Sequence, residues 1–289
     1  MRCLIACLLL PVLTLAACAP AAAPPREYEL AGQVLAVRAE SNEILIRHGD
    51  IKDFMPGMTM PFRVRDQALL GGVAPGDLVT ATLVVGDEAS YLSAITRTGS
   101  APLPEDATGF PAGTGVHILQ PGDEVPDTAL SDQEGDEVRL PDWRGQAVAV
   151  TFIFTRCPLP EFCPLMDKRF AEIQQGAAAD RALAGRVRLL SVSFDPDFDT
   201  PEVLKAHAGR LGADPAVWRF ATAPVDIVDR FAAEFGVNVI RETDGGITHT
   251  LRTAVIGPDG RMVSVYSGNL WTAAEILDDL RSTRPGTTR

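Results

Sequence analysis

Residues 147–164 decide the fold, and they read Ala-Val-Ala-Val-Thr-Phe-Ile-Phe-Thr-Arg-Cys-Pro-Leu-Pro-Glu-Phe-Cys-Pro. The continuous apolar run at 147–155 is typical of a strand buried on both faces of a sheet. Apolar residues then follow helical spacing at Met166, Phe170 and Ile173. Two cysteines therefore lie where a central strand ends and a helix begins, which is where α/β sheets usually carry their chemistry.

The second cysteine is expected at a helix N-terminus, because Pro164 fits the first helical position. There the helix dipole and free backbone N–H groups favour a thiolate, so we expect a lowered pKa for Cys163. Two nearby thiols can form a structural disulfide between Cys157 and Cys163, act as a redox pair, or bind a soft metal ion. The residues alone leave these alternatives open.

The segments that follow alternate between helices and strands. We predict a strand at 187–194, helices at 201–210 and 225–235, a strand pair at 252–256 and 262–266, and a helix at 272–280. This order indicates an α/β domain with a late hairpin, as in the thioredoxin fold. Met166 is expected in the core, whereas His117 and His207 are expected at the surface.

This second domain resembles the Sco/SenC family of thioredoxin-fold copper chaperones over about residues 122–280. The matching motifs are Phe154-Thr155-x-Cys157-Pro158, Cys163-Pro164, Ser193-Phe194-Asp195-Pro196-x-x-Asp199-Thr200-Pro201-Glu202, and His249 ahead of Ile256-Gly257-Pro258-Asp259-Gly260. The resemblance implies a copper site formed by Cys157, Cys163 and His249, here called the thiol site. The family usually has three residues between its cysteines, whereas this chain has five, which leaves redox chemistry more open.

The first domain, residues 28–97, has short strand-like runs separated by turn signals. They lie at 33–38, 43–47, 58–64, 78–85 and 91–95. Five short strands in so few residues predict a small, closed, OB-like β-barrel.

Methionines gather in this first domain. Met55, Met58 and Met60 follow His48 and are three of the six methionines of the chain. Met58 and Met60 are two positions apart on a predicted strand, so their side chains face the same way. Such a pair usually packs in a core, but a Pro-Gly pair and a later proline interrupt this strand, so we expect its face to be poorly suited to burial. Thioether and imidazole donors form a soft set that favours Cu(I) over calcium or magnesium.

The same segment looks like the small copper-binding barrel of the CusF type. That resemblance implies copper binding by His48, Met58 and Met60, here called the methionine site. The family often places a tryptophan over the ion, and Met55 stands at that position here. Either Met55 adds a thioether ligand or Phe54 supplies the aromatic cover.

The first 17 residues read as an export signal, because a basic start precedes an apolar run too short to span a bilayer. Leu15-Ala16-Ala17-Cys18 resembles the lipobox of bacterial lipoproteins, which implies cleavage before Cys18 and lipid on its sulfur. Residues 18–27 form a Pro/Ala spacer, 98–115 a linker, and 116–289 the second domain. We therefore expect an exported protein, lipid-anchored to a membrane and facing the periplasm.

The net charge of -12 disfavours nucleic acid as a partner. Soft thiolates favour Cu(I), while an added imidazole also suits Cu(II) and zinc, so copper is selected by the resemblance. The leading hypothesis is a copper chaperone that serves a copper-receiving protein such as a cytochrome c oxidase subunit, with the barrel capturing or relaying Cu(I). The alternatives are a thiol-disulfide oxidoreductase that keeps such a protein's cysteines reduced, and copper sequestration for resistance.

Overall fold

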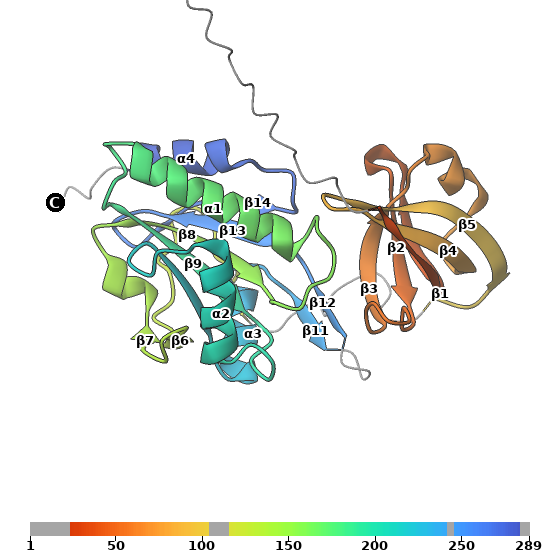
Figure 1. The fold of residues 1–289 in the computed structure, drawn as a ribbon, viewed down its shortest axis with the longest axis horizontal. Helices are drawn as coiled ribbons and strands as arrows, with labels where there is room; N and C mark the ends of the chain where they lie inside the picture. Colours follow the sequence, from red (N-terminus) through yellow and green to blue (C-terminus); the bar gives the residue numbers. More distant parts are fainter. Residues whose placement is uncertain (1–23, 104–115, 242–245, 284–289) are drawn as a thin grey trace, which may run out of the picture.

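The computed structural model of the protein describes residues 24–103, 116–241 and 246–283. They form two domains that lie side by side, a β-rich domain and a larger α/β domain (Figure 1). The expected signal segment and Cys18 lie outside the described residues. Within those residues, no helix is both long and apolar enough to cross a membrane.

The β-rich domain, here called the barrel domain, is one antiparallel sheet in the order β3-β2-β1-β4-β5. Its strands are β1 (Arg26–Arg38), β2 (Glu43–His48), β3 (Met58–Arg63), β4 (Asp77–Val85) and β5 (Ser90–Ser100). The sheet curls until its edges meet at a single bridge between Val64 and Leu92. The five predicted strands and the barrel-like class are confirmed, although the barrel is only partly closed.

Close packing of β1 on β2 explains one glycine in the barrel domain. A Cβ atom at Gly32 would lie 2.5 Å from the carbonyl oxygen of Arg47. Only a residue without a side chain allows this approach. A bulge between Val34 and Ala36 then bends β1, which helps the sheet to curl.

The α/β domain, here called the thiol domain, has a seven-stranded sheet in the order β14-β13-β8-β9-β10-β6-β7. Its strands are β6 (Leu130–Asp132), β7 (Glu137–Val138), β8 (Ala147–Ile153), β9 (Val187–Ser193), β10 (Trp218–Thr222), β13 (Arg252–Ile256) and β14 (Met262–Ser267). The helices are α1 (Cys163–Ala179), α2 (Pro201–Leu211), α3 (Val225–Glu234) and α4 (Ala273–Ser282). The parallel strands β8, β9 and β10 with a late antiparallel hairpin confirm the thioredoxin-like class.

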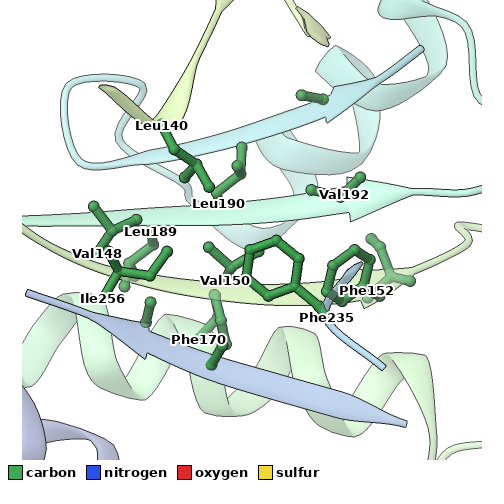
Figure 2. Packing of buried hydrophobic residues seen from close by; sticks show 14 of the residues in the cluster. Leu140, Val148, Val150, Phe152, Phe170, Leu189, Leu190, Val192, Phe235 and Ile256 are labelled. Carbon is green, nitrogen blue, oxygen red and sulfur yellow. The ribbon is translucent and has the colours of Figure 1, made fainter. Parts of the chain in front are cut away.

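Strand β8 lies at the centre of this sheet, and all seven of its residues are buried, as the apolar run predicts. Helices α1 and α4 lie together on one face of the sheet, and α3 lies below it (Figure 1). Figure 2 shows the core from close by, with Val150 and Phe152 of β8 near Phe235. Phe152 also packs against Phe231 of α3, so α3 is held by aromatic contacts. Met166 is 1% exposed, which confirms it as a core residue.

The sequence does not predict several short elements, among them β10 and a separate two-stranded ribbon of β11 (Val239–Arg241) and β12 (Ile247–His249). Runs this short carry too few residues to show a period of two. The surface prediction for His207 is wrong, because its ring is buried against Phe220 and bonded to Asp167 at 2.7 Å.

Candidate metal centres

The two cysteines lie at either end of the loop that joins β8 to α1. Cys157 is half-buried, whereas Cys163 is 2% exposed and is the first residue of the helix. Both are free thiols. The S–H of Cys163 donates to the sulfur of Cys157, and the backbone N–H of Cys163 points to the same sulfur. The structure therefore brings the two sulfur atoms together despite the longer spacing.

The predicted lowering of the Cys163 pKa is wrong. Burial raises the pKa of Cys163 well above its usual range, and the neighbouring sulfur of Cys157 raises it further. Desolvation of the thiolate outweighs the helix N-terminus at this position. The hydrogen bond from Cys163 instead lowers the pKa of Cys157. Cys157 is therefore the thiol that ionises first.

Two buried aspartates brace the start of this loop. Asp199 accepts hydrogen bonds from both the backbone N–H and the hydroxyl of Thr155. The carboxylate of Asp195 accepts a hydrogen bond from the guanidinium of Arg156, with 2.6 Å between Nε and Oδ2. The two residues before Cys157 are thus fixed by the loop that follows β9. The sequence motif around these aspartates marked them as family residues but did not show this contact.

His249 lies on β12, opposite Val239 of β11. Its Nδ1–H donates to the carbonyl oxygen of Thr250 at 3.1 Å, so the lone pair is on Nε2. Its ring packs on Phe194 with centroids 4.5 Å apart and on Phe154 at 5.9 Å. Burial lowers its pKa to about 4, which keeps the imidazole neutral and able to bind a metal at neutral pH.

The three residues of the thiol site do not form a closed ligand set. In residues 24–103, 116–241 and 246–283, no three side chains of His, Cys, Asp or Glu are gathered as a metal cluster. The Phe154 ring contacts His249, and the Phe154 carbonyl accepts from the backbone N–H of Cys157 at 3.3 Å. His249 thus lies one aromatic residue away from the thiol pair.

The methionine site is on the inner face of the barrel sheet. His48 of β2 lies directly opposite Met58 of β3, and Met60 is on the same face. All three are buried, at 3%, 7% and 8% exposure, so the expectation that this face is poorly suited to burial is wrong, because the curled sheet encloses it. The Nδ1–H of His48 donates to the Gly49 carbonyl at 2.8 Å, so Nε2 carries the lone pair. The structure places the two thioethers on one face, as their spacing predicts, and the imidazole of His48 lies on that face too.

Of the two proposed additions to this site, Met55 lies in the same buried cluster as Met58 and Met60. Phe54 packs against the same cluster and stacks on Tyr28, with ring centroids 4.2 Å apart. Both residues therefore adjoin the two thioethers, and both alternatives stay predictions.

The two candidate sites adjoin each other across the domain contact. Leu159, from the loop between the cysteines, is buried in the hydrophobic cluster of the barrel domain together with its methionines. Cys157 packs against the hydrophobic clusters of both domains. In Figure 1 this loop and the β11–β12 ribbon both point toward the barrel. No local sequence pattern predicts this contact, because residues far apart in the chain make it.

Two family models match different parts of the chain. Residues 119–284 match the family model described as SCO1/SenC. Residues 27–97 match the model described as copper binding periplasmic protein CusF.

Individual relatives resemble the thiol domain. A SCO1 protein homolog from Bacillus subtilis (strain 168) is 28% identical over 163 residues, which cover 55% of this chain and 82% of that protein. The crystal structure of a SCO1/SenC family lipoprotein from Bacillus anthracis str. Ames has a TM-score of 0.52 and 25% identity, covering 57% of this chain and 98% of that one. The structure of BsSco, described as having a disulfide switch and as a member of the Sco family of cytochrome c oxidase assembly proteins, has a TM-score of 0.50 and 28% identity, covering 57% and 96%.

Proposed function

The chain belongs to the SCO1/SenC family, and from that premise we propose that it is an exported copper chaperone with two copper sites. Copper is its cargo, bound as Cu(I) at the methionine site and as Cu(I) or Cu(II) at the thiol site. Lipid on Cys18 would hold the protein at a membrane, facing the periplasm. The receiving protein would be one such as a cytochrome c oxidase subunit, because BsSco is described as belonging to an oxidase assembly family.

The observation that carries this proposal is the pairing of two soft donor sets in one molecule. In one domain two interacting thiols are separated from a neutral imidazole by the ring of Phe154, and in the other two thioethers share one sheet face with an imidazole. Sulfur and imidazole donors suit copper, whereas calcium and magnesium need the oxygen ligands that these sites lack. The match of the first domain to a copper-binding family supports the same metal.

A second candidate function, thiol-disulfide exchange, is favoured by the unequal thiols. Cys157 has a lowered pKa and is half-buried, while Cys163 has a raised pKa and is almost completely buried. An accessible thiolate next to a buried thiol is the arrangement of an attacking and a resolving cysteine. A disulfide between Cys157 and Cys163 is the oxidised form that both functions predict.

Copper analysis of the full chain tests the proposal. The reduced chain should bind two copper ions, and the chain oxidised with a mild thiol oxidant should bind one, because oxidation removes thiolates and spares thioethers. Replacing Cys157 or Cys163 by serine should remove the redox-sensitive ion alone. A reduced chain that binds one copper ion, and keeps it in the double cysteine variant, would reassign the thiol domain to redox exchange.

A further inference from the structure

The five residues between the cysteines make an extensive contact with the barrel domain. Leu159 is 2% exposed and belongs to the barrel's hydrophobic cluster rather than to that of its own domain. Phe162 packs against the same barrel cluster. A leucine that packs in the hydrophobic cluster of another domain stabilises the docked arrangement. The barrel domain therefore covers the apolar tip of the longer loop.

A polar contact accompanies this apolar one. The half-buried carboxylate of Glu161 accepts the backbone N–H of Ser90 at 3.1 Å and the Ser90 hydroxyl as well. Ser90 is 4% exposed and is the first residue of β5. The carbonyl oxygen of Glu161 accepts the side-chain amide of Asn269 at 2.8 Å, which ties the loop back to the thiol domain. Hydrogen bonds to a buried carboxylate are costly to lose, so this contact fixes the orientation of docking.

A third contact links strand β3, which carries the two methionines, to strand β12, which carries His249. The backbone N–H of Thr59 donates to Oγ1 of Thr248 at 2.8 Å. Thr59 lies between the two methionines of the methionine site, and Thr248 directly precedes His249. Strand β3 is an edge strand of the barrel sheet, and β12 covers part of that edge. Candidate ligands of both sites are therefore sequence neighbours of two residues that are hydrogen-bonded to each other.

We propose that residues 158–162 form a docking element that holds the barrel domain on the thiol site, so that Cu(I) passes between the two sites inside one molecule. This inference rests on the proposed function. It adds that the partner of each site is the other domain of the same chain, and that the longer cysteine spacing serves docking.

The transfer is a ligand exchange without a change in oxidation state. Cu(I) leaves the thioethers of Met58 and Met60 and the imidazole of His48, and it forms bonds to the sulfurs of Cys157 and Cys163. Each thiol that becomes a ligand releases its proton to water. Anionic thiolates hold a cation more strongly than neutral thioethers, so the expected direction is from the barrel to the thiol site.

The experiment follows copper movement in the full chain. Oxidising the cysteines leaves only the methionine site open, and one equivalent of Cu(I) is then added. A phosphine reductant opens the thiol site, and the ultraviolet absorption of copper thiolate bonds reports the transfer. Because both domains share one chain, the rate should not depend on protein concentration. Hydrogen exchange at the Thr59 amide reports docking in the same samples.

Two variants break the docking element from opposite sides. Leu159→Asp puts a charge into the barrel cluster, and Ser90→Ala removes the hydroxyl that Glu161 accepts, away from every candidate ligand. The control is Glu124→Ala, which changes an exposed carboxylate that is bonded to Arg144 within the thiol domain. Leu159→Asp should undock the domains and slow transfer by about tenfold or more, as expected when the buried centre of a contact is lost. Ser90→Ala should act in the same direction more weakly.

The outcomes separate this inference from the proposed function. If both sites bind copper but wild-type transfer speeds up in proportion to protein concentration, the intramolecular route is wrong and the chaperone proposal stands. If Leu159→Asp exposes the Thr59 amide without slowing transfer, or leaves that amide protected, the docking element is wrong. If either site binds no copper at equilibrium, the proposed function itself fails.

Discussion

Asp199, which is completely buried, accepts both the backbone N–H and the hydroxyl of Thr155, two residues before Cys157. This relationship joins the loop after β9 to the loop that carries the thiols. The position of Cys157 therefore depends on a residue 42 positions further along the chain.

Asp199→Asn should therefore loosen the thiol site. The amide cannot accept from both groups of Thr155 as the carboxylate does, and we expect a loss of about 1–3 kcal/mol in the free energy of unfolding. Copper affinity at the thiol site should fall as well. Urea unfolding and copper titration measure the two effects. The control is Asp197→Asn, an exposed neighbour, and equal behaviour of the two variants would contradict the bracing role.

Met58→Leu and Met60→Leu should each weaken Cu(I) binding at the methionine site while the fold survives. Leucine nearly conserves the hydrophobic volume, so the cost in stability should stay below ~1.5 kcal/mol. The measurement is a Cu(I) titration of the full chain with both cysteines replaced by serine, which isolates this site. Met262→Leu, a buried methionine of the thiol domain, is the matched control. Unchanged affinity in the Met58/Met60 double variant would return these methionines to core packing.

Cys163→Ala should raise the pKa of Cys157, because it removes the S–H that donates to the Cys157 sulfur. The rate of alkylation of Cys157 as a function of pH reports this pKa. In the wild-type chain the first thiol to be alkylated should be Cys157, since burial raises the pKa of Cys163. Peptide mapping after partial alkylation identifies the modified residue. Earlier labelling of Cys163 would contradict the order of ionisation found in the structure.

Tyr266 should make the protein lose stability at high pH. Burial raises its pKa to about 12, and its hydroxyl donates to Asp279 at 2.6 Å, which also disfavours the phenolate. The folded state thus holds this proton more tightly than the unfolded state, where the pKa is about 10. The contribution to stability is complete below pH 10 and is lost as the pH rises toward 12. Unfolding midpoints measured across this range should fall less steeply in Tyr266→Phe, and parallel curves would exclude the effect.

The sequence predicted the elements that have a long or regular pattern. The apolar run of β8, the helical spacing of α1 and the five barrel strands were all recognisable, because burial on one face or two imposes a period on the residues. The alternation at Met58 and Met60 likewise predicted a shared face, which β3 shows.

What the sequence did not predict depends on contacts between distant residues. The pKa order of the thiols follows from how deeply α1 buries Cys163, which no local motif records. The charged neighbours of His207 on its helix favour a surface position, yet its ring is bonded to Asp167 of α1. In the domain contact, Leu159 and Thr248 of the thiol domain meet residues of the barrel domain. The sequence motif of one domain carries no information on where the other domain lies.

The cover that β12 places over β3 has a consequence for the barrel domain as an isolated fragment. An uncovered edge strand presents a row of backbone N–H and C=O groups that can pair with another chain. In the full protein the Thr59 amide on this edge is bonded to Thr248. A fragment ending at Ser100 would expose that edge together with the apolar patch that Leu159 fills. The fragment should therefore self-associate through this edge. In the full protein the thiol domain covers the edge and so opposes aggregation.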